Sequence, residues 1–297
     1  MKRFGIAVLV CCSIGLAVPP AQATFPGAPG KIVFYTYDLP NRIVTINPDG
    51  SGRTALTGTD ENAQTPEWSP NGLQIAFTSD FGRSRRVEIM DADGGNRSVV
   101  FDDQGRRFTS IGGVDWSPDG ATLAICASRR TWFNYRILLV DIATGSRERI
   151  GLRGDCDPSW SPLGDKIAVT AFDPDTFRSS VATMAIDGSD RQVVAPRGFQ
   201  PDWSPTGDRI VYANRDIFIV NADGSGRARF TKPTVRQEYT PTWAPDGSRI
   251  AFARAQGRSS LAQDDIFLQP LDSQQEVRVT ETPADEFWLS WQPIVGP

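Results

Sequence analysis

Gln64-Thr65-Pro66-Glu67-Trp68-Ser69-Pro70-Asn71-Gly72 is a stretch that the chain repeats, with variations, five more times. The later copies centre on Trp116, Trp160, Trp203, Trp243 and, in a degraded form, Trp291. Successive tryptophans are 48, 44, 43, 40 and 48 residues apart. A period of this length has room for about four short strands with their turns.

Two further apolar runs recur inside each period. The first follows the tryptophan at a constant offset, as Ile75-Ala76-Phe77, Leu123-Ala124-Ile125, Ile167-Ala168-Val169, Ile210-Val211-Tyr212 and Ile250-Ala251-Phe252. The second, exemplified by Ile137-Leu138-Leu139-Val140, leads in most units through an Asp-Gly turn into a final strand. Short β-branched and aromatic runs between such turns predict strands, and Asp-Gly supplies the positive φ of a tight hairpin. The sequence therefore predicts an all-β fold, a six-bladed β-propeller.

The two ends of the chain complement each other. Lys31-Ile32-Val33-Phe34 matches the second strand of a unit, and nothing before it supplies a first strand. The segment from Trp288 to Pro293 has the pattern of that first strand. We therefore expect the C-terminal strand to complete the first blade and to close the ring, which removes an open edge. On this interpretation residues 24–297 form a single propeller domain.

Residues 1–23 have the layout of a secretory signal peptide. Lys2 and Arg3 precede an apolar run from Phe4 to Val18, and the small-x-small triplet Ala21-Gln22-Ala23 follows. The run is too short to span a bilayer, and no second long apolar stretch exists. Cleavage after Ala23 would release an exported protein, periplasmic or secreted, without a membrane span. A retained membrane anchor is the alternative.

The charge balance argues against nucleic acid as a partner. The formal net charge is −4, and loss of Lys2 and Arg3 with the leader takes it to −6. No basic cluster with interleaved aromatic residues is present in the sequence. We expect a solvated surface of mixed charge on a monomeric protein.

Cys126 and Cys156 are the two cysteines outside the leader. In an exported protein such a pair can form a disulfide. The alternative is two separate small residues of the core, because unpaired cysteine is commonly buried. We favour two separate core residues.

The repeat pattern Pro-x-Trp-Ser-Pro-Asp-Gly, followed by an Ile-Ala-Phe strand and an Asn-Ala-Asp-Gly turn, resembles the propeller of TolB and its relatives. The resemblance covers nearly all of the chain after residue 23, and it implies an interaction platform of the cell envelope. Such propellers also occur as non-catalytic domains attached to serine peptidases. In TolB an N-terminal α/β domain precedes the propeller, and we expect this domain to be absent here because Lys31 already opens the first propeller strand.

The chain contains no histidine. A Ser-His-Asp triad and a Cys-His pair are therefore impossible, and metal sites built on histidine are excluded. We expect a non-catalytic protein with no cofactor and no metal site. The alternative is an enzyme that uses carboxylates alone, for example on a saccharide of the envelope.

The residue before each repeat tryptophan belongs to a set that could line the central channel. The set is Glu67, Asp115, Ser159, Asp202, Thr242 and Ser290. Three carboxylates in one ring could hold a cation or orient a polar ligand. The alternative, which we favour, is that these side chains satisfy neighbouring backbone groups.

Blade geometry places the Trp-Ser-Pro and Asp-Gly turns on one face and the longer, irregular connections on the other. Candidate partner-binding residues on the second face are Arg129, Trp132, Phe133, Tyr135, Phe172 and Phe177, and Tyr239 and Phe287 are candidates for the channel mouth. Aromatic residues and arginine on loops of a rigid scaffold are typical of binding surfaces. The alternative is that these rings pack onto their own blades. We predict an exported module that binds a protein or a cell-envelope component.

Overall fold

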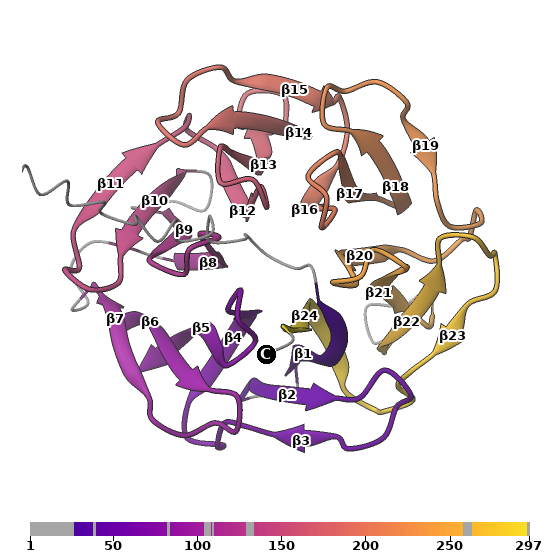
Figure 1. Cartoon of the computed structure of the whole chain (residues 1–297), viewed down its shortest axis with the longest axis horizontal. Coiled ribbons are helices and arrows are strands. Elements are labelled where there is room, and N and C mark those ends of the chain that lie inside the picture. Colours follow the sequence, from indigo (N-terminus) through magenta and orange to yellow (C-terminus); the bar gives the residue numbers. More distant parts are fainter. Residues whose placement is uncertain are drawn as a thin grey trace, which may run out of the picture.

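The computed structural model describes residues 27–37, 40–81, 84–103, 108, 110–128, 134–257 and 263–295. Within these residues the regular structure is β, and six four-stranded antiparallel sheets stand around a central axis (Figure 1). The six-bladed β-propeller predicted from the tryptophan repeat is thereby confirmed. No helix among the described residues has the length and apolar character needed to cross a membrane. The predicted signal peptide, residues 1–23, lies outside the described residues.

We number the blades I to VI along the chain and give their strands from the axis outward (Figure 1). Blade I consists of β24 (Asp285–Ile294), β1 (Ala28–Tyr37), β2 (Arg42–Ile46) and β3 (Thr54–Ala55). Blade II consists of β4 (Asn62–Trp68), β5 (Gln74–Phe81), β6 (Ser84–Asp91) and β7 (Ser98–Asp102). Blade III consists of β8 (Ser110–Trp116), β9 (Thr122–Ser128), β10 (Tyr135–Asp141) and β11 (Arg147–Ile150).

The other three blades follow the same plan. Blade IV consists of β12 (Asp155–Trp160), β13 (Lys166–Asp173), β14 (Arg178–Ala185) and β15 (Gln192–Ala195). Blade V consists of β16 (Phe199–Trp203), β17 (Arg209–Asn214), β18 (Asp216–Asn221) and β19 (Ala228–Arg229). Blade VI consists of β20 (Glu238–Trp243), β21 (Arg249–Ala255), β22 (Asp264–Pro270) and β23 (Val277–Arg278).

Ring closure follows the prediction from the two chain ends. The C-terminal strand β24 pairs antiparallel with β1, with Ile32 opposite Trp291 and Val33 opposite Ser290. It occupies the innermost position of blade I (Figure 1). The first and last segments of the propeller therefore share one sheet, which joins them by backbone hydrogen bonds.

The repeat tryptophans fill the interfaces between adjacent blades. Each of the six is at most 5% exposed. Trp116 packs in one buried cluster with Ala76 and Ile89 of blade II and with Leu138 of its own blade. Its indole Nε1 donates to the carbonyl of Glu67 at 3.2 Å, so the ring also joins the two blades by a hydrogen bond. The core is thus a set of layers between blades, and the tryptophans are scaffold, as predicted.

The two kinds of turn share one face of the ring, as blade geometry requires. In blade II the N–H of Ala92, in the Asp-Gly turn, donates to the carbonyl of Leu73, in the Trp-Ser-Pro turn, at 2.9 Å. The equivalent bond in blade V joins Ala222 to Asp208 at 2.9 Å. We call this the turn face, and the opposite side, where the remaining connections lie, the loop face.

The expectation that Cys126 and Cys156 are separate core residues is wrong. The two cysteines form a disulfide between β9 of blade III and β12 of blade IV, with their Cα atoms 5.0 Å apart. They lie on facing surfaces of adjacent blades, where strand packing brings the two Cα atoms within disulfide range. A separation of 30 residues along the chain carries no sign of this proximity.

Each innermost strand has an irregular register just before its tryptophan. Three residues before the tryptophan, the backbone is left-handed at non-glycine residues in five blades, namely at Thr65, Asp157, Gln200, Thr240 and Trp288. Such β-bulges re-aim the side chains around them. Here four of the five bulge residues, all except Thr65, line a cavity on the axis.

Candidate functional site

The cavity on the propeller axis has a volume of only about 60 Å³. Five members of the predicted ring line it, namely Glu67, Asp115, Ser159, Asp202 and Thr242. The sixth, Ser290, is buried beside them, and its hydroxyl bonds to the Glu67 carboxylate. Pockets for small organic ligands usually have volumes of roughly 300 Å³ or more. The axis is therefore too narrow for a saccharide unit.

Trp288 is one reason why the axis is narrow. It lies at the bulge of β24 in blade I, whereas Gly113 lies in β8 of blade III. A methyl group placed on Gly113 would come within 3.5 Å of Cζ2 of Trp288. The indole thus reaches toward a blade that is not its neighbour in the ring, and glycine provides the room for it. The sequence pattern of the closing strand includes this tryptophan but does not predict its place on the axis.

Four members of the predicted ring tie one blade to the next. Each accepts a hydrogen bond from the backbone N–H of the repeat tryptophan in the following blade. The pairs are Trp160 to Asp115, Trp203 to Ser159 at 3.3 Å, Trp243 to Asp202 at 2.8 Å and Trp68 to Ser290 at 3.1 Å. These four side chains therefore form hydrogen bonds with backbone groups of the neighbouring blade, which is the alternative favoured from the sequence over a cation or ligand site.

Burial changes the acidity of the axial carboxyl groups. It raises the pKa of Asp115 to about 8 and the pKa of Asp202 to about 6. Burial, together with the nearby Asp115, also raises the pKa of Glu67 well above its usual value. At neutral pH the ring therefore carries fewer than three negative charges. In the part of the chain that the structure describes, no group of three or more acidic or cysteine side chains is arranged to hold a metal ion.

Of the predicted partner-binding residues of blades III and IV, the structure describes Tyr135, Phe172 and Phe177. Tyr135 packs, partly buried, against the core between these blades. Phe172 and Phe177 make an edge-to-face contact with ring centroids 6.2 Å apart, and Phe177 is 69% exposed. The predicted residues Arg129, Trp132 and Phe133 lie outside the described residues.

The two candidates for the channel mouth contact each other across blades VI and I. The ring centroids of Tyr239 and Phe287 are 6.3 Å apart, and Phe287 also packs against Tyr35 at 5.9 Å. Beside them, burial and the nearby Asp285 raise the pKa of Asp264 to about 7. This aromatic group lies two blades away from the pair Phe172 and Phe177.

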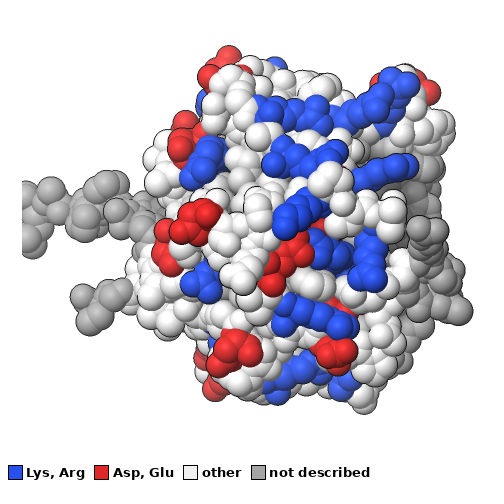
Figure 2. Space-filling model, turned by 90° about the vertical axis from the view of Figure 1, so that its right-hand side faces the viewer, with Lys and Arg blue, Asp and Glu red and all other residues white. Residues whose placement is uncertain are grey.

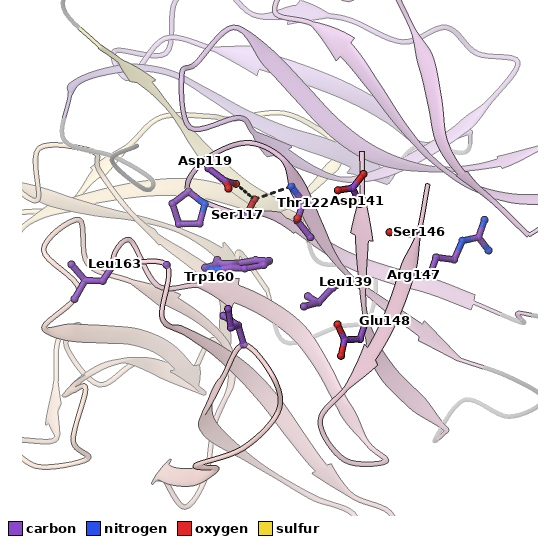
Figure 3. Close-up of a pocket in the computed structure, with 13 residues that line it drawn as sticks. Ser117, Asp119, Thr122, Leu139, Asp141, Ser146, Arg147, Glu148, Trp160 and Leu163 are labelled. Carbon is purple, nitrogen blue, oxygen red and sulfur yellow. Dashed lines mark hydrogen bonds between the residues drawn. The ribbon is translucent and has the colours of Figure 1, made fainter. Parts of the chain in front are cut away.

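A groove that sequence analysis missed opens between blades III and IV on the turn face (Figure 3). Its volume is about 660 Å³. Apolar side chains form its floor and walls, namely Pro118, Leu139, Trp160, Leu163 and Ile186. Acidic side chains, Asp119, Asp141 and Glu148, stand around it. We call this site the Trp160 groove.

The Trp160 groove exists because one side chain of the repeat is short. Six residues after the repeat tryptophan, blades II, IV, V and VI carry long polar side chains, namely Gln74, Lys166, Arg209 and Arg249. The guanidinium of Arg209 covers the ring of Trp243 in the following blade at 4.9 Å. A smaller groove near Arg209, of about 420 Å³, accordingly does not reach Trp243. Blade III has Thr122 at this position, so the space beside Trp160 stays open. Comparison of the copies at this position is the signal that could have found the groove.

The geometry defines the class of this protein as a six-bladed β-propeller with a closed axis and an open groove between two blades. The model of the TolB beta propeller domain matches residues 29–263, and the chain belongs to this family.

Two curated relatives match parts of the chain. The Tol-Pal system protein TolB of Alcanivorax borkumensis is 33% identical over 114 residues, which cover 35% of this chain and 25% of the relative. The uncharacterized protein Atu1656 of Agrobacterium fabrum is 29% identical over 110 residues, which cover 37% of this chain and 36% of the relative. The matches thus span between a quarter and about a third of the relatives' own lengths.

Solved structures share the fold at lower identity. TolB from Acinetobacter baumannii superposes with a TM-score of 0.74 at 17% identity, covering 89% of this chain and 67% of that one. A putative TolB from Agrobacterium tumefaciens superposes with a TM-score of 0.70 at 19% identity, covering 90% of this chain and 100% of that one. An oligogalacturonate lyase in complex with manganese superposes with a TM-score of 0.53 at 14% identity, covering 87% of this chain and 74% of that one. The fold by itself therefore does not decide between binding and catalysis.

Proposed function

We propose that this protein is an exported, non-catalytic binding module of the cell envelope, and that a partner protein docks in the Trp160 groove. The observation that carries the proposal is the open groove of about 660 Å³ with apolar residues exposed at its edge. Leu163 is 70% exposed and Ile186 is 43% exposed. Apolar residues gathered on one surface, next to a buried tryptophan, are typical of protein interfaces.

The charges around the groove define the partner's chemistry. Asp119, Asp141 and Glu148 line it, whereas the one basic residue, Arg147, is directed away from Trp160 (Figure 3). Hydrogen bonds from Thr144 hold the pKa of Asp141 below its usual value, so this carboxylate is charged at neutral pH. The site therefore suits an extended segment with one apolar side chain for the floor and a lysine or arginine beside it.

The axial carboxyl groups support a non-catalytic function. A carboxylate enzyme needs two acidic groups that face each other across a pocket of ligand size. Here the axial cavity measures about 60 Å³, and Asp115 and Asp202 accept backbone hydrogen bonds from the next blade. The geometry of the axis thus favours a structural role for these groups over catalysis.

Export is supported by two independent features. Residues 1–23 have the layout of a signal peptide. The disulfide between Cys126 and Cys156 belongs in an oxidising compartment. Similarity to a Tol-Pal system protein is in keeping with a partner in the cell envelope.

Peptide selection on the purified protein tests this proposal. Displayed random peptides are selected for binding to the wild type, and the selected sequences are titrated against Thr122→Arg, which should cover Trp160 as Arg209 covers Trp243. We expect selected peptides that combine an apolar residue with lysine or arginine, and binding at least about tenfold weaker in the variant.

The matched control is Gln74→Arg, which places the same side chain at the same repeat position beside Trp116. This control should bind the peptides as the wild type does. Undiminished binding to Thr122→Arg, or selection of acidic peptides, would contradict the proposal.

A further inference from the structure

A second groove lies on the opposite side of blade III, facing blade II. Its volume is about 620 Å³, and its lining includes Phe108, Ala127, Leu138 and three arginines, Arg136, Arg147 and Arg149. Strand pairing sets Leu138 opposite Arg149, and Arg136 precedes Leu138 by two residues on β10. Alternate residues of a strand share one face of a sheet. We call this site the arginine groove.

In other blades the arginine that follows the outer turn has a fixed partner. The pairs are Arg53 with Glu286 at 3.4 Å, Arg97 with Glu61 at 2.6 Å and Arg191 with Asp155 at 2.7 Å. In blade V, Arg227 donates to the hydroxyl of Tyr212 at 2.6 Å. Arg147 holds this position in blade III, and neither it nor Arg136 or Arg149 forms an ion pair within the described residues.

The missing counter-charge has a cause in the sequence. Five residues before the repeat tryptophan, blades I, IV and VI carry Glu286, Asp155 and Glu238, whereas blades II, III and V carry Ala63, Ile111 and Gly198. Blade II supplies its acidic partner two residues earlier, at Glu61, where blade III has residue 109, a threonine. The stretches 104–107 and 129–133, which adjoin the groove residues along the chain, contain no acidic residue in their sequences. The positive charge of the arginine groove is therefore not balanced by its own blade.

On the opposite flank of the ring, formed by blades V and VI, arginines form ion pairs with acidic residues, unlike those of the arginine groove. Figure 2 shows that basic residues cover more of the flank of blades V and VI than acidic ones, and that some of them stand beside acidic residues. Arg229 lies 3.2 Å from Asp216, and Arg278 lies 2.7 Å from Asp265. Arginine is thus neutralised where the repeat supplies an acidic neighbour.

Packing and strand geometry fix the positions of the arginine side chains in the groove. The guanidinium of Arg147 stacks on the ring of Phe101 in blade II at 4.2 Å. Arg149 follows two residues later, which on a strand means a spacing of about 7 Å. Burial, followed by the charge of Arg149, lowers the pKa of Arg136. Guanidinium groups in such an arrangement suit carboxylate or phosphate, which they bind through paired N–H donors.

We propose that the arginine groove binds a small polyanion with at least two carboxylate or phosphate groups. Arg147 and Arg149 contact two of these groups, and Arg136 supplies the third positive charge. Ala127, Leu138 and Phe108 cover the uncharged part of the ligand. The groove has the volume of a small-ligand site. Arg147 borders both grooves, whereas the other residues named here line the arginine groove and not the Trp160 groove.

Calorimetric titration tests the proposal with two probes, tripolyphosphate and citrate, at low ionic strength. The site variant is Arg147→Gln/Arg149→Gln. The control is Arg178→Gln/Arg197→Gln, which removes the same charge from exposed arginines of blade IV and its connection to blade V. Circular dichroism checks that both variants are folded.

We expect saturable binding of at least one probe, weakened at least about tenfold in the site variant and changed less than twofold in the control. Binding of tripolyphosphate but not of citrate identifies a phosphate ligand, and binding of citrate but not of tripolyphosphate identifies a carboxylate ligand. The proposal is overturned if neither probe binds saturably, or if both variants lose affinity equally.

Discussion

The axis of the propeller and the flanks of blade III differ in how closely they follow the repeat. At the axis, equivalent residues before the tryptophans bond to the next blade, and only about 60 Å³ remains empty. On the flanks of blade III, Thr122 replaces a long polar residue, and Ile111 stands where three other blades carry an acidic one. Grooves of about 660 and 620 Å³ border the blade. Regular repetition closes space, and single departures from it open sites.

The physical basis of this difference is local contact. Away from the axis, each blade packs against its two neighbours, so a donor in one copy meets the equivalent acceptor in the next. When one copy carries a shorter or uncharged side chain, no other blade can reach the gap. Departures from the repeat therefore persist as grooves.

The largest effect is expected at a tryptophan that no groove borders. Trp203 is 1% exposed, and both its backbone N–H and its indole bond to Ser159. Trp203→Ala should lower the free energy of unfolding by ~3–5 kcal/mol. Trp160→Ala should cost less, because Trp160 already borders an open groove. Urea denaturation measures both, and an equal or larger loss for Trp160→Ala would contradict the comparison.

The disulfide should make the next largest contribution. Cys126 and Cys156 join blades III and IV, the same two blades that the Trp160 groove separates on the turn face. Cys126→Ser/Cys156→Ser should lower the free energy of unfolding by about 3 kcal/mol, because the unfolded chain gains freedom. Reduction of the wild type should reproduce this loss and leave the variant unchanged. If reduction has no effect on the wild type, the two thiols are not paired.

The axial carboxyl groups predict a pH dependence of stability. Burial raises the pKa of Asp115 to about 8 and of Asp202 to about 6, so the folded state keeps protons that the unfolded state releases. The contribution of these two groups to stability should be complete below about pH 4 and should fall, on the order of 1 kcal/mol per pH unit, as the pH rises toward 8. Urea denaturation between pH 5 and pH 8 measures this slope.

Asp202→Asn is the matched variant for this slope. It removes one titrating group and one charge that raises the pKa of Asp115, while an amide oxygen can still accept from Trp243. We expect a flatter pH profile and a higher stability than the wild type at pH 8. A stability that rises with pH in the wild type, or an unchanged slope in the variant, would show that these groups stay ionised in the fold.

The smallest effects on the free energy of unfolding are expected when the side chains at equivalent positions of blades III and V, Thr122 and Arg209, are exchanged. Arg209→Thr should cost about 0.5–1 kcal/mol, because the guanidinium no longer covers Trp243. Thr122→Arg should change the free energy of unfolding by no more than about 0.5 kcal/mol, since it adds a side chain at a surface position. Thermal denaturation of the two variants checks both values. A large loss in Thr122→Arg would mean that the groove cannot accommodate an arginine as blade V does.

The sequence predicted what depends on repetition. The tryptophan period predicted six blades, and the pattern from Trp288 to Pro293 predicted closure by β24, because both are regular along the chain. The disulfide and the axial position of Trp288 could not be predicted, since each depends on which side chains face one another between blades. The Trp160 groove could have been predicted by comparing Thr122 with its counterparts. The predicted loop-face residues, among them Phe177, stay a prediction.

Photocrosslinking in living cells tests the central claim, that function lies where blade III departs from the repeat. A photoreactive amino acid is placed either at Leu163, in the Trp160 groove, or at Phe177, on the loop face; both residues are exposed. The account predicts a crosslinked partner from position 163, lost when Thr122→Arg is added, and none from position 177. Crosslinks from position 177 with none from position 163 would contradict it.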